Sequence, residues 1–386
     1  MGVNTFQYGD DQEVAVKLQS TFGTAVVPAA TNMVRSLAAT FGQPVDYQPV
    51  RDRRKTRSLM EEKRARTPVQ PWSISIIVRP SGTLGVAPDW GDLLKLVFGT
   101  EAVVASTSVT YSLLQDMTGI YATLFRELST IQEGVYDAVC QSCEISWSGD
   151  GFAMITFSGV ASEFIEASRS PALGNGYAVA DVVVDDADFF TKFGVLQNVT
   201  GSDDNTGAGY QITAVDYDTN TLTLASAPTS WADNDIWGAF LPAGSYVGDP
   251  IFGTQCTFSL DGGSTTMGHL GGTISISTGH DLYNREAGTQ QANDVILPTQ
   301  RAITGTINYV VKEAETYVES HARRGVAKDF QIILGDTAAE RVTFNLDNVR
   351  MEPGQRTTPE EGPVENTISF TARGTSGEDE INAVFD

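Results

Sequence analysis

The sequence predicts a mainly β protein of the α+β class, with two short helices and two similar halves that flank an inserted small β module. Three observations predict this class. Apolar and polar residues alternate in many short segments, which is typical of half-buried strands. Two other segments carry apolar residues at helical spacing. The same order of elements occurs twice along the 386 residues, in a chain long enough for two or three domains.

The first half opens with an alternating strand and reaches its helix after a long connection. Trp72 and Ile74 fall on one face of the second strand, as a period of two residues requires. The helix carries an apolar stripe that includes Trp90 and Leu94, and Gly99 stands just past its end. The expected elements are strands at 13–18, 72–79, 120–128, 138–147 and 152–160, with a helix at 88–98.

The second half repeats the order of strand, long loop, strand, helix and three strands. Its helix places Tyr317, Val318 and His321 on one stripe and ends before Gly325. The expected elements are strands at 256–260, 303–311, 329–334, 342–349 and 366–373, a helix at 313–324, and a long polar loop before residue 303. Chance similarity between two α+β segments is the alternative to a repeat.

A segment of different composition separates the two halves. It holds twelve acidic residues against Arg169 and Lys192, and it is rich in Gly, Asp and Thr. Strands at 210–216 and 221–224 flank a polar turn and predict a hairpin. Because the segment resembles neither half, we interpret it as an insertion on an exposed surface. The expected domains are residues 1–165, 166–250 and 251–386, the last with an acidic C-terminal tail.

The bulk properties exclude several classes of protein. No run of about eighteen apolar residues occurs, so we expect no transmembrane helix. The first residues have neither a basic start nor an apolar run, so we expect no secretory signal and assembly in a cytoplasm. The net charge of −23 disfavours an ordinary nucleic-acid binder, which presents a basic surface.

The three cysteines provide no disulfide framework. Cys140 and Cys143 form a C-x-x-C pair within an alternating segment, where a spacing of three puts side chains on opposite faces of a strand. A redox or metal pair needs its two thiols together. We therefore expect structural thiols, with Cys143 in the core beside Ile145 and Trp147.

No catalytic set stands out in the sequence. The histidines His269, His280 and His321 are isolated, and His321 is expected to be half-buried on its helix. Asp216 opens a segment that resembles a calcium loop, but the twelfth position is Ala227 instead of glutamate, so a hairpin turn explains it better. The many carboxylates leave a glycosidase-like pair open, although no pair is distinguished from the rest. We expect no enzyme and no catalytic, cofactor or metal site.

One segment is basic against the acidic background. Residues 51–66 carry eight Lys or Arg against three acids, and they fill the connection between the first two strands. A solvated loop, a nucleic-acid contact and a protein contact are the three interpretations. We favour contact with the acidic surface of a neighbouring subunit or ring, because opposite charges guide encounter and registry. The residues of this basic arm are Arg51, Arg53, Arg54, Lys55, Arg57, Lys63, Arg64 and Arg66.

The order of elements resembles the tail tube fold of long-tailed phages. Residues 67–77, followed by 88–94 and by Phe98-Gly99, look like the helix region of tube (major tail) proteins from non-contractile siphophage tails. Residues 303–374 repeat the layout. The resemblance implies two copies of a tail-tube-like β-sandwich or barrel domain, and it does not extend to the inserted segment.

The resemblance implies a structural virion protein. Six tube domains would surround a channel, with inner strands paired edge to edge and rings stacked into a tube for DNA ejection. Two copies per chain would make each ring from three chains with pseudo-sixfold symmetry, whereas one copy would require six chains. DNA would meet the protein only in transit, and an acidic wall would leave the counterions of the DNA in place.

The same resemblance implies the partners. These are the chain itself, a tape measure protein, a tail terminator and distal tail proteins, with no cofactor and no membrane, in a virion tail assembled in the host cytoplasm. A terminator, connector or baseplate ring of the same fold is an alternative. A β-rich adhesin or carbohydrate-binding protein is an alternative of another class; it would carry a secretion signal and exposed aromatic platforms, and neither is evident.

Overall fold

The computed structural model describes residues 12–49, 62–64, 66–173, 179–229, 231–261, 265–312, 316–354, 356–357 and 362–386. The mainly β class is confirmed, since the described residues contain many strands and two α-helices, α1 (Gly91–Phe98) and α2 (Thr316–Arg324). Within these ranges, short 3-10 turns at Ala30–Asn32, Ala187–Phe189 and Gly253–Gln255 connect strands.

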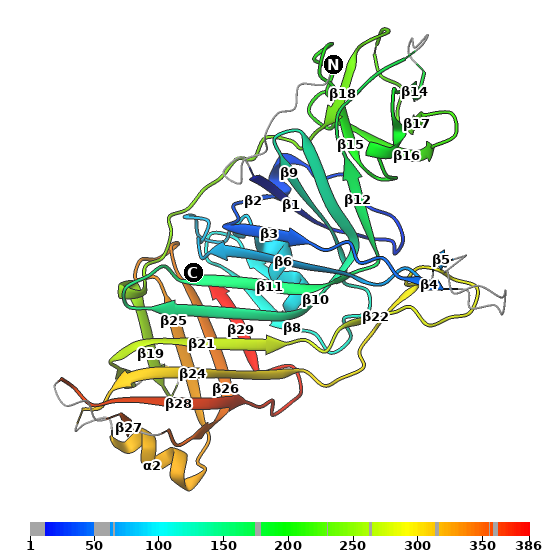
Figure 1. Ribbon diagram of the computed structural model, residues 1–386. Helices are drawn as coiled ribbons and strands as arrows, with labels where there is room; N and C mark the ends of the chain where they lie inside the picture. Colours follow the sequence, from blue (N-terminus) through cyan, green and yellow to red (C-terminus); the bar gives the residue numbers. More distant parts are fainter. Residues whose placement is uncertain are drawn as a thin grey trace.

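One long antiparallel sheet runs through both halves of the chain, and we call it the shared sheet. Its strands are, in spatial order, β3 (Ala38–Phe41), β6 (Gln70–Ile77), β11 (Met154–Ala161), β10 (Ile131–Ser148), β21 (His269–Ser277), β24 (Ala302–Val310) and β28 (Glu365–Ala372). Figure 1 shows these strands stacked in that order. The ladder between β10 and β21 joins the two halves, and we call it the internal joint.

Each half also has an outer sheet that shares one bent strand with the shared sheet. The outer sheet of the first half is β2 (Met33–Val34), β1 (Gln12–Leu18), β9 (Ala122–Leu128), β10 and β12 (Glu163–Ala167). That of the second half is β20 (Thr265–Met267), β19 (Cys256–Leu260), β25 (Lys328–Leu334), β26 (Val342–Glu352), β29 (Ile381–Phe385), β8 (Ser108–Leu113) and β7 (Gly99–Val104).

The strand pairings of the two halves follow the same order. The series β1, β9, β10, β12 in the first half corresponds to β19, β25, β26, β29 in the second. Within the shared sheet, Ile76 lies opposite Ile155, and Ile307 lies opposite Ile368. Small hairpins, β4 (Tyr47–Pro49) with β5 (Glu62–Arg64) and β22 (Asp281–Tyr283) with β23 (Asp294–Ile296), occupy equivalent connections.

Several regions depart from the sequence expectations. The long connection expected in the first half contains β2 to β5, and the expected acidic C-terminal tail contains β29, which pairs with β26 and β8. The loop expected before residue 303 instead contains β20 to β23, and β21 alone spans nine residues. The β7–β8 hairpin after α1 was not expected either, and the second half has only residues 325–327 between α2 and β25. Burial does alternate along β8 of this hairpin. The strand that pairs with the outer side of β8 is, however, the C-terminal strand β29, and no local pattern in the sequence reveals that partner.

Helix α1 lies in the common core, where it begins at Gly91 and not at Pro88. Residues 88–90 form a turn in which the Gly91 N–H donates to the Pro88 carbonyl at 3.0 Å. Gly99 ends the helix with a positive φ of 96° and donates to the Lys95 carbonyl, as a glycine cap does. Trp90 lies between Phe157 of β11 and Phe385 of β29, with ring centroids 6.4 and 5.6 Å away, so one core serves both halves.

The segment between the halves forms a separate sheet. Its strands, in spatial order, are β13 (Ser170–Pro171), β18 (Ile236–Ala239), β15 (Val195–Asn198), β16 (Tyr210–Asp216), β17 (Thr221–Leu224) and β14 (Asp181–Val183). Its core includes Tyr210 and Trp237, whose rings lie 5.8 Å apart. Most of this sheet lies at the upper end of the molecule in Figure 1, away from α2. The expected hairpin at 210–224 is present as β16 and β17.

The expectation that Cys140 and Cys143 face opposite sides of a strand was wrong. Both thiols are buried in the same core, because the β10 register shifts between Cys140 and Ser142 at a bulge. Burial raises the pKa of the Cys140 thiol to about 12 and that of Cys143 well above its ordinary value. Both are free thiols, and these properties support the expected structural role.

Candidate assembly surface

The solvent-facing side of the shared sheet is lined with hydroxyl groups, and we call it the hydroxyl face. Side chains alternate along each strand, so the apolar set enters the core and the polar set faces outward. On β6, β11, β10, β21, β24 and β28, these outward positions are mostly serine and threonine: Ser73, Ser75, Thr156, Ser158, Ser142, Ser146, Ser148, Thr273, Ser275, Ser277, Thr304, Thr306, Thr367, Ser369 and Thr371.

Neighbouring strands connect these hydroxyls in pairs. The Ser75 and Thr156 oxygens lie 3.0 Å apart, and those of Thr273 and Thr306 lie 2.9 Å apart. On the last two strands, the Thr367 hydroxyl donates to the Asn308 amide oxygen at 2.7 Å. Such pairs fix the rotamers of short, uncharged side chains. The face is therefore polar and regular, with few mobile charges.

Charged residues on these six strands are sparse at the outward positions. Glu144 of β10 and Glu365 of β28 are the carboxylates there, and both are exposed. Most of the acidic character of the chain thus lies elsewhere. The outward serines and threonines were visible in the sequence as the polar half of each alternating strand, but their meeting on one face depended on the strand order.

The shared sheet has an open edge at β3. No strand in the described part of the chain pairs with the outer side of β3, whose inner side pairs with β6. The Gly42 N–H donates to the Pro71 carbonyl at 2.8 Å and continues this ladder. Because the direction of backbone groups alternates, those of Ala39 and Phe41 point to the outer side. Phe41 is half-buried, and the Arg126 guanidinium lies 5.7 Å from its ring centroid.

The opposite edge is formed by the end of β26 and by β27 (Arg356–Thr357), both of which pair with β28. No described strand covers their outer side. Met351 is buried, whereas Arg350 and Glu352 are exposed. Pro353 follows, and proline is tolerated at an edge because its missing N–H breaks no ladder there.

A buried polar cluster holds β27 in place. Glu319 of α2 is 4% exposed and accepts hydrogen bonds from the Arg356 Nε at 2.8 Å and the Asn366 Nδ2 at 2.9 Å. The Tyr309 hydroxyl donates to the same carboxylate at 3.2 Å. The hydrogen bonds from Arg356 hold the pKa of Glu319 below its ordinary value. The carboxylate therefore stays ionised at neutral pH and fixes the edge strand against the helix.

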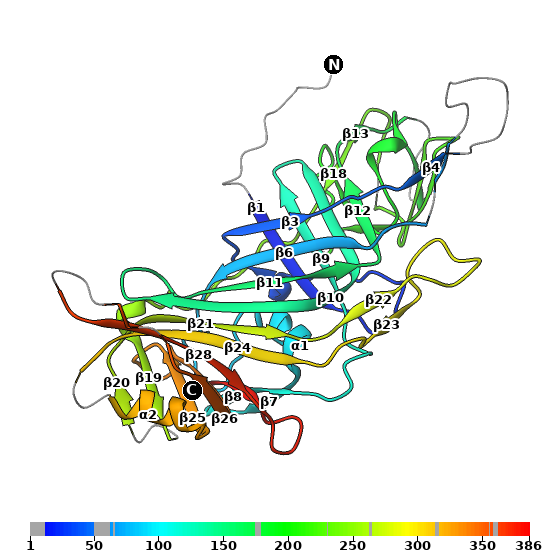
Figure 2. The same cartoon turned by 60° about the horizontal axis from the view of Figure 1, so that its bottom comes forward.

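The basic arm lies partly outside the described residues. Arg51, Arg53, Arg54, Lys55 and Arg57 fall there, whereas Lys63 and Arg64 belong to β5, which pairs with β4. Arg66 donates to the backbone carbonyls of Asn284 and Glu286, the latter at 2.8 Å. The base of the arm thus contacts the β22–β23 connection of the second half, and both hairpins extend from the same end of the sheet (Figures 1 and 2). Contact of the arm with another subunit stays a prediction.

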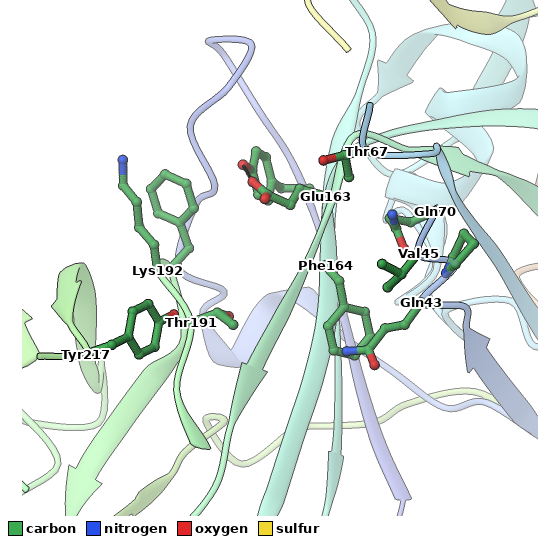
Figure 3. Close-up of a pocket in the computed structure, with 12 residues that line it drawn as sticks. Gln43, Val45, Thr67, Gln70, Glu163, Phe164, Thr191, Lys192 and Tyr217 are labelled. Carbon is green, nitrogen blue, oxygen red and sulfur yellow. Dashed lines mark hydrogen bonds between the residues drawn. The ribbon is translucent and has the colours of Figure 1, made fainter. Parts of the chain in front are cut away.

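A hollow of about 400 Å³ lies between β12, the segment before β4 and the inserted sheet. Figure 3 shows Glu163 and Phe164 on one side and Lys192 and Tyr217, which lie in connections of the inserted sheet, on the other. The Tyr136 hydroxyl donates to Glu163, and burial, followed by this contact with a carboxylate, raises the pKa of Tyr136. The described residues that line the hollow include no histidine, serine or cysteine.

The other candidates for chemistry have structural surroundings. His280 is buried, with Nδ1 3.2 Å from the Cys140 carbonyl oxygen, and His321 is half-buried on α2 as expected. Asp216 accepts from the Asp218 and Thr219 N–H groups, so the calcium-like segment is a hairpin turn. No group of metal-binding residues occurs within the described ranges. None of the described helices is long and apolar enough to span a membrane.

Comparisons with known proteins give no match to a protein-family model and none to a curated protein. Among solved structures, a chain in the tail of an empty gene transfer agent particle, refined with C6 symmetry, is 14% identical; the match covers 31% of this chain and 91% of that chain, with a TM-score of 0.23. A chain of a native gene transfer agent virion is 18% identical, with coverages of 32% and 94% and a TM-score of 0.23. Similarity at these levels carries no argument about function.

Proposed function

We propose that this chain is a self-assembling structural protein of a virion tail, and that it polymerises into stacked rings that form the tube of a long, non-contractile phage tail. The internal joint carries this proposal. It pairs an edge strand of one half with the first shared-sheet strand of the other over seven residue positions. Two similar units thus already associate edge to edge, while no strand among the described residues covers the outer sides of β3 and β26–β27.

The form of the two edges favours a ring over a two-fold dimer. The edges belong to different strands, so a contact between them is head-to-tail and repeats until it closes or continues as a filament. With two tube-like units per chain, three chains supply six units around the axis. Six chains per ring would be needed if one chain supplied a single unit.

The hydroxyl face suits the wall of a channel for DNA. Fixed cations on a wall would displace the counterions of DNA and hold it, and the described outward positions on the six long strands of this face carry none. The expected acidic wall is reduced here to a sparsely charged one. Glu144 and Glu365 lie on its six long strands, and Arg350 and Glu352 of the edge strand β26 lie opposite Thr371 and Ser369 of the same face. DNA would therefore pass a hydrated surface that neither binds its phosphates strongly nor repels them strongly.

The inserted segment and the basic arm have proposed roles outside the channel. We assign residues 1–165 and 251–386 to the two tube-like domains and 166–250 to an exterior domain, which agrees with the separate core of the inserted sheet. The basic arm would reach the neighbouring subunit or ring. A tape measure protein, a tail terminator and distal tail proteins would be the other partners, and DNA would contact the protein only in transit.

Negative-stain microscopy of the purified chain tests the proposal. We expect hollow tubes or stacked rings, with a tail initiator complex added if the chain alone stays soluble. Single rings that never stack would instead indicate a terminator, connector or baseplate component of the same fold. A folded monomer that persists in the presence of initiator would overturn the proposal.

The channel assignment has its own test. Ser75→Lys combined with Thr306→Lys places two cations on the hydroxyl face, one in each half. We expect assembled tubes that retain DNA at low salt, with retention lost as salt rises. Lysines at the exposed positions Ile236 and Leu173 on the inserted sheet are the matched control. Equal retention by both variants would contradict the assignment.

A further inference from the structure

The hollow between the first half and the inserted sheet has a buried floor and an exposed rim. Tyr136, Phe193 and Gln70 line it and are buried. Val45 and Tyr217 also line it, and both are more than half exposed. The volume of about 400 Å³ falls within the range of small-molecule sites. The hollow is therefore open to solvent and large enough for a small ligand or the end of a longer one.

Phe193 reaches the floor through an unusual backbone conformation. The Gly194 N–H donates to the Thr191 carbonyl at 3.2 Å and closes a turn, and Phe193 has a φ of 76° at the third position of that turn. Positive φ at this position favours glycine, so a bulky side chain there costs free energy. Such strain is frequent at ligand-binding sites, where the surrounding structure fixes it. Here it places the Phe193 ring edge-on against Tyr136, with ring centroids 5.1 Å apart.

Two oxygen atoms in the hollow have spare capacity to accept hydrogen bonds. The Tyr136 hydroxyl and the Gln291 amide both donate to Oε2 of Glu163, the latter at 2.6 Å, and Oε1 accepts none among the described residues. Gln70, which is 3% exposed, donates from Nε2 to the Pro68 carbonyl at 2.7 Å. Its Oε1 is buried and has no partner within the described ranges. Because a buried acceptor without a partner is costly, a ligand hydroxyl that satisfied it would be bound favourably.

The charges of the lining disfavour charged ligands. Lys192 lies across the hollow from Glu163 (Figure 3), and its ammonium lies 4.7 Å from the Phe193 ring centroid. With this one cation and one anion, the described lining has no net charge. An anionic ligand would be repelled by the Glu163 carboxylate, and an amine would be repelled by the Lys192 ammonium. The lining thus favours a neutral ligand.

The rest of the lining combines aromatic rings with small polar groups. Phe164 of β12 and Tyr217 of the turn between β16 and β17 lie on opposite sides (Figure 3). Gln43 and Thr67 add an amide and a hydroxyl group on the Phe164 side. A few polar groups in a largely aromatic site fix the orientation of a ligand. Sugars suit this combination, because a sugar ring has an apolar face of C–H groups and a rim of hydroxyls that both donate and accept.

We propose that the hollow is a binding site for a neutral saccharide, which Glu163 and Gln70 hold through its hydroxyl groups and the aromatic walls hold through its apolar face. The inference goes beyond the proposed tail function and does not depend on assembly, since one chain supplies every residue named. In a tube, the hollow would lie beside the exterior domain and repeat along the tail. Repeated sites raise the overall affinity for a surface coated with saccharides.

An array of immobilised oligosaccharides tests the inference with the full chain. It carries neutral chains of hexose and N-acetylhexosamine units, acidic chains that contain uronic or sialic acid, and an amine surface without sugar. We expect binding to neutral chains and none to the amine surface. Absence of binding to every neutral chain would overturn the proposal, and so would binding to acidic chains alone.

Variants locate the binding on the protein. Glu163→Gln replaces the carboxylate acceptor and Tyr217→Ala removes an exposed ring, so each should weaken binding of the selected neutral saccharide by roughly tenfold or more. The matched controls are Glu166→Gln on the same strand and Phe189→Ala in the inserted segment, which change an acid and an exposed ring outside the described lining. Isothermal titration calorimetry measures the affinities, and circular dichroism verifies each fold.

The outcomes separate this site from the tail function. Wild-type affinity in both site variants, or an equal loss in the controls, would overturn the proposal. Hollow tubes that bind no saccharide would refute the binding site and leave the proposed tail function intact. A chain that binds saccharide through Glu163 and Tyr217 but forms no tubes would support the site and refute the tube.

Discussion

The internal joint and the open edges use equivalent strands, yet they differ in the number of ladders that would hold the two units together. The joint within the chain combines the β10–β21 ladder with a second ladder, in which β8 of the first half pairs with β29 of the second. Among the described residues, a contact between chains would have the β3 and β26–β27 ladder alone, because residues 325–327, between α2 and β25, form no equivalent of the β7–β8 hairpin.

This difference indicates two classes of contact in one assembly. The internal joint has a continuous core beneath it, including Trp90 and Phe385, and its partners are always present because one chain supplies both. The contact between chains depends on concentration, since each strand must find a second molecule. Such a difference lets a chain fold as a monomer and assemble later.

The largest expected effect breaks the internal joint. Ile274→Ala removes a fully buried side chain opposite Ile145 and should cost about 2–5 kcal/mol of unfolding free energy. Urea denaturation measures the loss. Ser275→Ala, one residue along on the hydroxyl face, should change the stability by less than about 0.5 kcal/mol. Similar losses of unfolding free energy in both variants would mean that the buried side of the internal joint contributes no more to stability than its exposed side.

The next effect separates assembly from folding. Phe41→Lys places a charge on the open edge, which natural proteins use to prevent strand addition. We expect a folded monomer and a rise of roughly tenfold or more in the concentration needed for assembly, as a loss of about 1.4 kcal/mol per contact implies. Sedimentation at a series of protein concentrations measures the concentration needed for assembly. Leu173→Lys on the inserted sheet should assemble normally; if both variants fail alike, the effect is general and not one of the edge.

Acid should weaken the β27 edge. Because Arg356 lowers the pKa of Glu319 in the folded protein, ionised Glu319 stabilises the fold fully above its unfolded pKa of about 4.3. That contribution is lost as the pH falls through the lower folded value. Glu319→Gln should be less stable than wild type at pH 7, and the difference should shrink below pH 4 in urea titrations. A constant difference from pH 7 to 3 would argue against the role of this carboxylate.

The smallest effect on assembly is expected for a residue away from both contacts. Glu127 of β9 lies directly opposite Glu13 of β1, and burial followed by this neighbouring charge raises the pKa of Glu127 to about 8. The folded protein binds the proton more tightly, so stability falls as the pH rises from about 4.3 toward 8. Glu127→Gln should flatten this slope and leave assembly unchanged. Thermal unfolding between pH 5 and 8 gives the slope for both proteins.

The sequence predicted the units better than their connections. Strand alternation located β6, β11 and β24, and apolar spacing located both helices, since these signals depend on neighbours a few residues away. The 261–302 region was expected to be a loop, although Thr273, Ile274, Ser275 and Ile276 do alternate there. The cysteine pair was misplaced because a bulge, which has no reliable local signal, shifts the register by one residue.

The sequence by itself determined the class of the protein, the two helices, the acidic composition and the separate character of the middle segment, since these follow from residue types and their spacing. Only the tertiary structure decided that β10 meets β21, that the hydroxyls share one face, and that no described strand covers the outer sides of β3 and β26–β27. Strand order depends on contacts between residues more than a hundred positions apart, such as Ile145 and Ile274, and no local pattern encodes which edge meets which.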